Sequence, residues 1–298
     1  MTTVETGTGS PAASSPAVPS GLGAGPLLRA WRERRRLSQL ELALRADSSA
    51  RHISFVETGR SRPSEEMVLR LAEHLDVPVR ERNALLLAAG YAPRYRETPW
   101  DDPALHGLRA GVERLLRGYE PYPALVVDAL YTVQAANRGI TMLLEGVAES
   151  LLTPPLNAMR LTLHPRGLAP RIRNLPQWRR HLLAQMERQI ALRRSAPLRE
   201  LYEEVAAYPV PETADPCEPD GPDGPDGPDG PDGPDGPDGP VPYVALPLRI
   251  EHGGRTLSFV SSISTFNTPM DVTVAELAIE TFLPADPATA AYLRALSG

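Results

Sequence analysis

Residues 37–63, LSQLELALRADSSARHISFVETGRSRP, carry the signals of two short helices joined by a tight turn. Ser38 stands at an N-cap position and Glu41 follows three residues later, which is the pattern of a capping box. A second N-cap, Ser48 or Ser49, precedes the next helix. The stretch therefore predicts two helices in close succession.

Helical spacing of the apolar residues predicts which sides of these helices face the protein core. Leu40, Ala43 and Leu44 fall on one face of the first helix. Ala46 and Asp47 fill the turn, and Gly59 suits the left-handed position that follows a helix. The side chains that we expect in the core are Leu40, Leu42, Ile53 and Val56.

The spacing resembles the helix-turn-helix of the phage-repressor-like (Xre) family over residues 25–91. Trp31 replaces the second leucine of the family's usual run. The residues that match the first half of the pattern are Leu28, Arg32, Glu33, Leu37, Ser38, Gln39, Leu42 and Ala43; those that match the second half are Ile53, Ser54, Glu57, Gly59, Pro63 and Ser64. The resemblance implies an all-α, five-helix head that binds DNA.

Position by position, the resemblance also implies the DNA contacts. Gln39 would donate to a phosphate, with help from the N-terminus of its helix. Arg60 and Arg62, in the loop after the second helix, look like further phosphate contacts. The residues that would face base edges in the major groove are Ser49, Ala50, Arg51 and Phe55.

Arg51 and Phe55 are the two positions in this set whose side chains differ most in what they could contact. Arg51 is the strongest candidate, because a guanidinium pairs with guanine O6 and N7. Phe55 could contact a thymine methyl group or fold back onto the protein, and the sequence does not choose. For Arg32 and Glu57 the resemblance favours an internal ion pair that braces the first and third helices.

Charge and composition agree with a DNA-binding head attached to a second domain. The 298-residue chain has a net charge of −6, but residues 25–94 hold thirteen arginines against nine acidic residues. We expect a disordered tail over residues 1–24, the head over 25–92, a hinge over 93–103 and a second domain over 104–298. We expect a surface loop of the second domain to hold an extended, acidic, disordered insertion over 212–240, with seven Pro-Asp-Gly triplets.

The sequence argues against secretion and against a membrane protein. Cys217 is the only cysteine, so no intramolecular disulfide forms, and a reducing cytoplasm is the simplest setting. The first 24 residues lack the basic start and apolar block of a signal peptide. The longest apolar stretch, residues 84–92, is about half of what a bilayer requires.

In the second domain, β-prone runs are expected at residues 124–128 and 131–135, with a hairpin at 243–250 and 256–265. Trp178, Leu182, Met186 and Ile190 mark a strong helix. A last helix is expected from Thr273, with Leu277, Ala278 and Phe282 on its buried face. The order predicts an α+β, PAS-like domain.

Residues 124–139, 157–183 and 271–286 are similar to the MmyB-like ligand-binding domain found behind Xre-type heads. The resemblance covers residues 117–296 and implies a pocket for a small, apolar or fatty-acid-like molecule. Arg160 and Arg171 are the candidate partners of its carboxylate, and Trp178 is a candidate wall of the pocket.

Nothing in the sequence indicates catalysis or a cofactor. The six histidines are scattered without paired metal spacing, and no phosphate-binding glycine loop or nucleophile elbow occurs. The expected protein is therefore a cytoplasmic transcription regulator, a homodimer on a near-palindromic double-stranded operator, whose second domain senses a ligand. The alternative is a second domain that serves only dimerisation or protein interaction.

Overall fold

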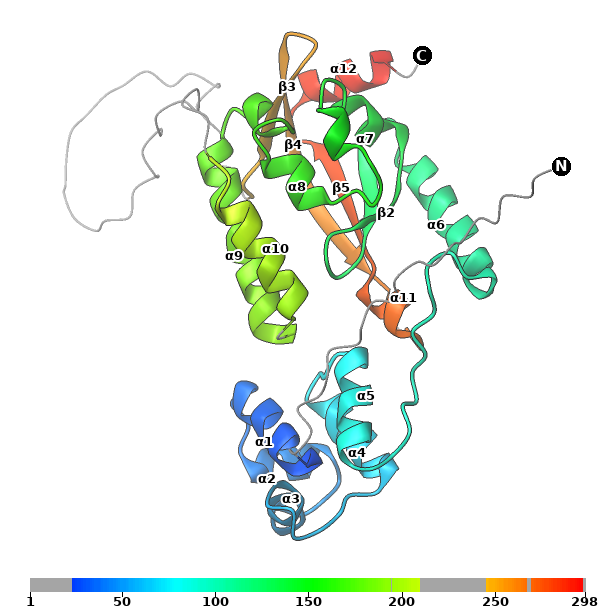
Figure 1. Ribbon diagram of the computed structural model, residues 1–298, viewed down its shortest axis with the longest axis vertical. Helices are drawn as coiled ribbons and strands as arrows, with labels where there is room; N and C mark the ends of the chain where they lie inside the picture. The colour runs from blue at the N-terminus through cyan, green and yellow to red at the C-terminus, as the bar shows by residue number, and fades with distance from the viewer. Residues whose placement is uncertain (1–22, 194, 210–244, 267–268, 297–298) are drawn as a thin grey trace, which may run out of the picture. The chain divides into compact units, whose positions relative to one another are not determined.

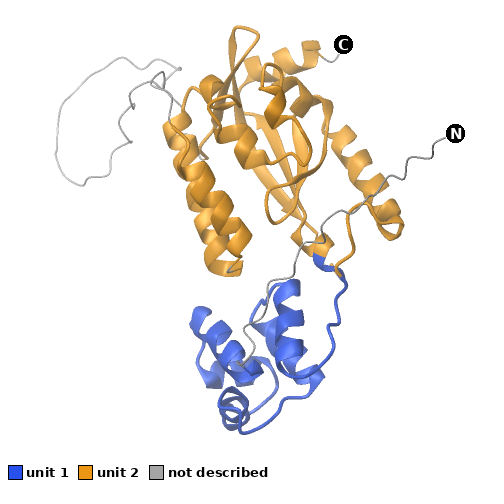
Figure 2. Cartoon of the chain, viewed as in Figure 1, with its two compact units in different colours: residues 1–96, 270–272 blue, residues 97–269, 273–298 orange. Residues whose placement is uncertain are grey.

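The computed structural model describes residues 23–193, 195–209, 245–266 and 269–296. Within them the chain forms two compact units, coloured separately in Figure 2: residues up to 96 together with 270–272, and the rest. The insertion at 212–240 lies outside the described residues, as does the expected tail except its end. Ala24, at that end, is the first residue of a helix rather than part of a tail.

The first unit is a head of five helices, as the sequence predicts (Figure 1). Their buried side chains form one apolar core, which includes Leu28, Trp31, Ile53, Leu71 and Leu86. The helices are α1 (Ala24–Arg34), α2 (Gln39–Arg45), α3 (Ala50–Glu57), α4 (Glu65–His74) and α5 (Val79–Ala88).

The predicted capping residues hold the ends of these helices. The Ser38 hydroxyl accepts a hydrogen bond from the Glu41 N–H, and the Glu41 carboxylate accepts one from the Ser38 N–H, which completes the capping box. The Ser64 hydroxyl caps α4 by accepting a hydrogen bond from the Met67 N–H. Gly59 and Gly90 have φ angles of 73° and 80°, the left-handed backbone that glycine adopts without steric penalty.

Two of the leucines expected in the core are instead at the surface. Leu40 is 59% exposed and Leu44 is 73% exposed, so their predicted burial is wrong. Leu42 and Ala43, both buried, already fill the inward side of the seven-residue helix α2. At 100° per residue, Leu40 and Leu44 then point away from the core.

The second unit is built on one antiparallel sheet of five strands in the order β2-β1-β5-β4-β3 (Figure 1). The predicted strands near residues 124–135 and the hairpin around Gly253 and Gly254 are confirmed. The strands are β1 (Ala124–Val127), β2 (Val133–Ala136), β3 (Leu248–His252), β4 (Arg255–Thr265) and β5 (Ala278–Pro284).

Helices cover the sheet on both faces. Leu125 and Val127 of β1 belong to the large apolar cluster, whereas Ala124 and Val126 belong to a smaller cluster formed with α6. Because strand side chains alternate, β1 is buried on both sides. The helices are α6 (His106–Gly118), α7 (Arg138–Leu143), α8 (Ala158–Leu163), α9 (Leu175–Arg193), α10 (Ala196–Ala206), α11 (Val272–Glu276) and α12 (Pro287–Leu296), with 3-10 turns at Pro103–Leu105, Glu149–Leu151 and Ala169–Arg171.

The last predicted helix is wrong beyond its first turn. α11 ends at Glu276, and β5 begins at Ala278 and pairs with β1 on one side and β4 on the other. Its residues alternate in burial, with Ile279 and Thr281 buried and their neighbours only partly buried. Pairing with two strands thus outweighs the local helical spacing.

Candidate nucleic-acid interface and ligand-binding core

The turn between α2 and α3 brings the two motif helices close together. Ala46 is fully buried in this turn, where a larger side chain would separate the helices. Asp47 has a φ of 48°, in the left-handed region that Asp tolerates better than most residues. Ser49 then caps α3, since its hydroxyl accepts a hydrogen bond from the His52 N–H at 3.1 Å.

Helix α3 buries one side and presents the other. Ile53 and Val56 lie in the core of the head, and Ala50 packs against its edge. Arg51 is exposed, and its guanidinium carbon lies 5.3 Å from the centre of the Phe55 ring. Phe55 is partly buried and lies outside the core cluster, and both the thymine contact and the fold-back onto the protein stay predictions.

A buried ion pair braces α1 against α3, as the sequence predicts. The Glu57 carboxylate accepts hydrogen bonds from Arg32 Nε at 2.6 Å and Arg32 Nη2 at 3.0 Å, and the Glu57 side chain is only 3% exposed. The remaining Arg32 nitrogen donates to the Leu37 carbonyl. The hydrogen bond to Glu57 raises the pKa of Arg32, so the guanidinium keeps its positive charge.

Gln39 belongs to the same network. Its side-chain amide donates to the Glu57 carboxylate at 2.8 Å, which holds the start of α2 against the end of α3. The amide nitrogen is therefore engaged within the protein, and its predicted donation to a phosphate stays a prediction. A second N–H of the amide and the backbone N–H groups at the start of α2 are the donors that a phosphate could use.

The two arginines after α3 occupy different environments. Arg60 is exposed. Arg62 donates to the carbonyls of Ala89 and Gly90 at 3.1 and 3.3 Å, and its guanidinium lies 5.2 Å from the centre of the Tyr91 ring. Arg62 therefore ties the loop after α3 to the end of α5, while the phosphate contact predicted for both stays untested.

In the second unit, Arg160 is held by a carboxylate. Its Nε and Nη2 donate to the two oxygens of Glu204 on α10 at 2.8 and 2.6 Å, a bidentate pair that is 44% exposed on the arginine side. This hydrogen bond raises the pKa of Arg160 and lowers the pKa of Glu204. Burial, and then the bond to Glu204, raises the pKa of Tyr208, which donates to the same carboxylate, to about 12.

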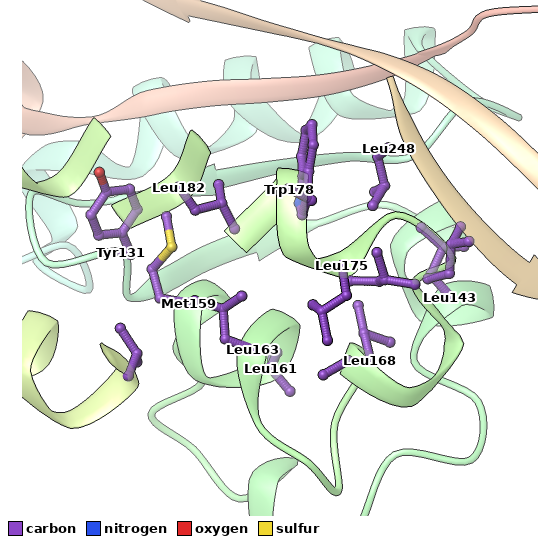
Figure 3. Close-up of a cluster of buried hydrophobic side chains, with 14 of the residues drawn as sticks. Tyr131, Leu143, Met159, Leu161, Leu163, Leu168, Leu175, Trp178, Leu182 and Leu248 are labelled. Carbon is purple, nitrogen blue, oxygen red and sulfur yellow. The ribbon is translucent and has the colours of Figure 1, made fainter. Parts of the chain in front are cut away.

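Arg171 and Trp178 are deeper in the domain. Arg171 donates to the backbone carbonyls of Leu143 and Glu145, and burial lowers its pKa. Trp178 lies among buried leucines from α7, α8 and α9 (Figure 3). The three predicted ligand residues are thus parts of one domain but have separate surroundings, and their contact with a ligand stays a prediction.

A polar group on the sheet was missed by the sequence reasoning. The Ser261 hydroxyl on β4 donates to the Glu280 carboxylate on β5 at 2.7 Å. Burial raises the pKa of Glu280, and the Ser261 hydrogen bond only partly opposes this. Residues 278–284 include the β-branched Ile279 and Thr281 and the aromatic Phe282, and this composition is the signal that could have identified the strand.

The pKa of the Tyr131 hydroxyl is affected by the charge of Glu280. Burial raises its pKa to about 12, with a further contribution from Glu280. Its φ of 60° is rare for a bulky residue, and the Asp128 side chain holds this turn by accepting hydrogen bonds from the N–H groups of Leu130 and Thr132. Within the described part of the chain, the Tyr131 hydroxyl has no hydrogen-bond partner.

The centre of the domain is apolar. Side chains from β1, α7, α8, α9 and α10 meet there, and several are completely buried, among them Met186 and Leu198. The described residues contain no group of three or more His, Cys, Asp or Glu side chains that could hold a metal ion. The same residues include no helix that is long and apolar enough to cross a membrane.

Comparison with known families matches both units. Residues 28–82 match the helix-turn-helix family, and residues 108–296, more than half of the chain, match the MmyB-like transcription regulator ligand binding domain. No curated protein matches the chain.

Proposed function

We propose a function for this chain, which belongs to the MmyB-like transcription regulator ligand binding domain family. It is a transcription regulator that binds an operator through α3. Its C-terminal domain senses a small apolar or fatty-acid-like molecule. The observation that carries the proposal is the combination of an exposed, arginine-bearing α3 with a large apolar core in the matched ligand-binding domain. Because DNA is the target, the proposal places the protein in the cytoplasm.

DNA binding rests on the surface of α3 and the loop after it. Arg51 offers donors to base edges, and the exposed Arg60 offers charge to a phosphate. Ser49 and Ala50 lie at the N-terminal end of the same helix, which is the end that a recognition helix directs at base edges. The buried Arg32 and Glu57 pair contributes by holding α3 in a fixed orientation on α1.

The ligand proposal rests on the apolar centre of the second domain. Each buried CH₂ group contributes about 0.8 kcal/mol, so an acyl chain gains most of its affinity from contact with side chains such as Met159, Leu182 and Met186. These side chains belong to one packed apolar cluster, so an entering acyl chain takes the place of contacts within that cluster. Trp178 is the proposed wall.

A carboxylate at the end of such a ligand needs a cationic or hydrogen-bonding partner. Arg160 is the better candidate because its guanidinium is nearly half exposed, although the ligand has to compete with Glu204. Arg171 is bound to two carbonyls and is less available.

The regulator is proposed to act as a homodimer. Two copies of the head would bind half-sites about one helical turn apart in a near-palindromic operator. A ligand regulates such a dimer only if it binds one arrangement of the heads better than the other. The closely packed apolar centre also favours a second candidate function, in which the C-terminal domain dimerises the protein without a ligand.

Native mass spectrometry of the full chain, repeated after denaturation, tests these functions. We expect a dimer that carries one small molecule per chain, and weaker retention of that molecule in Arg160→Ala. Glu113→Gln, on the exposed side of α6, serves as the control. A ligand-free dimer that still binds its own promoter DNA would instead assign the domain to assembly.

A further inference from the structure

Arg51 and Phe55 form an isolated pair on the outer side of α3. They are four residues apart, which places them on the same face of the helix, opposite to the buried Ile53. The guanidinium carbon of Arg51 lies 5.3 Å from the Phe55 ring centre, within the range of a cation–π interaction. The described residues provide no carboxylate partner for Arg51.

We propose that these two side chains act as one reading unit, which selects a guanine flanked by a thymine in each operator half-site. The inference rests on the proposed DNA-binding function and specifies its sequence preference. Neither residue has a role in the core, so their arrangement is available for an external partner.

The first half of the unit follows from the geometry of the guanidinium. Its N–H donors lie in the plane of the group, so contact with the Phe55 ring over its face leaves those donors free. Two of them match the O6 and N7 acceptors that guanine presents in the major groove. The ring restricts the guanidinium before DNA is bound, which reduces the ordering required on binding.

The second half follows from the chemistry of Phe55. A phenyl ring has no donor or acceptor, so it gains only from apolar atoms on a base edge. In the major groove, the C5 methyl group of thymine is the apolar atom that the unmodified bases offer. Because the ring adjoins the guanidinium, the methyl group that it meets belongs to the base pair next to the guanine.

Selection from a random pool of duplexes by the full-length protein tests the unit. The wild type is expected to enrich a motif with a guanine and an adjacent thymine in each half. Arg51→Lys, which keeps the charge but loses the planar fork, is expected to lose the preference for guanine. Phe55→Ala is expected to keep the guanine and lose the thymine.

A second experiment uses the selected duplex to test the contact with the thymine methyl group alone. Replacing the flanking thymine by uracil removes only the methyl group, and we expect it to weaken wild-type binding about fourfold. Phe55→Ala should bind the two duplexes equally, and uracil at the other thymines serves as the control. Arg51→Ala is expected to lower the affinity for the selected duplex about 5- to 150-fold.

The outcomes separate the inference from the proposed function. Enrichment of a motif without the guanine and thymine pair, or equal sensitivity to uracil in wild type and Phe55→Ala, overturns the reading unit alone. A wild-type protein that enriches no DNA overturns the proposed function. Because Phe55 is outside the core, unchanged thermal unfolding of Phe55→Ala is expected and confirms that the variant is folded.

Discussion

The N-terminal head and the C-terminal domain differ in how their candidate sites are built. In the head, the proposed base contacts lie on the single eight-residue helix α3, and the residues that hold this helix follow one spacing pattern. In the C-terminal domain, the proposed ligand contacts Arg160, Arg171 and Trp178 come from α8, the 3-10 turn before α9, and α9 itself. A surface site on one helix can be located from local sequence, whereas an interior site built from several separate elements cannot.

One carboxylate in each region has little access to solvent, and the two differ in how their charge is compensated. Glu57 accepts three hydrogen bonds from Arg32 and Gln39, so its charge is compensated. Glu280 has a hydrogen bond from the neutral Ser261, and burial raises its pKa. The charge in the head supports the structure, while the charge in the C-terminal domain opposes folding.

Removal of the Glu57 carboxylate, whose charge is compensated, is expected to have the largest effect on stability. Glu57→Ala leaves Arg32 buried without its partner, which should destabilise the head by about 3–5 kcal/mol. Hydrogen exchange of peptides from α1 and α3 measures this loss in the full chain. Glu33→Ala removes an exposed i,i+4 pair with Arg29 and serves as the control with little expected change.

Equal exchange rates in Glu57→Ala and Glu33→Ala would contradict the bracing role. Glu57 would then behave like an exposed carboxylate, and the contrast between Glu57 in the head and Glu280 in the C-terminal domain would no longer hold.

The second test separates two arginines that look alike in the sequence. Arg62→Ala removes the hydrogen bonds to the Ala89 and Gly90 carbonyls and is expected to destabilise the head by about 0.5–1.5 kcal/mol, because water can reach the exposed Gly90 carbonyl. Arg60→Ala should leave stability unchanged and reduce the slope of log K against log salt for DNA binding by about one. Thermal unfolding and binding at several salt concentrations measure both quantities.

The result that would reverse this assignment is a stable Arg62→Ala variant with a reduced salt slope. Arg62 would then be the phosphate contact that the motif implies.

The third and smallest expected effect concerns the uncompensated charge. Burial raises the folded-state pKa of Glu280 above its ordinary value of 4.5, so its contribution to stability is complete below that value and is lost as pH rises through the folded-state pKa. Glu280→Gln should therefore unfold at a higher temperature than wild type at pH 7, and the difference should vanish near pH 4.

Melting curves of both proteins between pH 4 and 8 provide the measurement, with the exposed Glu113→Gln as control. A wild type that is the more stable protein at pH 7 would mean that the Glu280 carboxylate is compensated, which would remove the contrast with Glu57.

Much of the head could be predicted because its signals are local. The capping box of Ser38 and Glu41, the left-handed Gly59 and the Arg32 and Glu57 pair are all at fixed distances in the chain. Leu40 and Leu44 were assigned wrongly because periodicity identifies a face but not what that face contacts.

The C-terminal domain was less predictable for a different reason. Strand β5 carries spacing that also suits a helix, and its conformation is settled by pairing with β1 and β4, the first of which is about 150 residues away in the chain. The candidates Arg160 and Arg171 are cations that flank the segment similar to the family, and the structure gives each of them partners within the protein.

The sequence by itself determined the five-helix head, the position of the recognition helix and the family of the second domain, because these depend on residue types at short, fixed separations. Only the tertiary structure decided that Phe55 lies beside Arg51 outside the core, that residues 278–284 form the strand between β1 and β4, and that Tyr131, Ser261 and Glu280 share one region. Such arrangements depend on which distant segments pack together, and on the burial and charge that each side chain meets there.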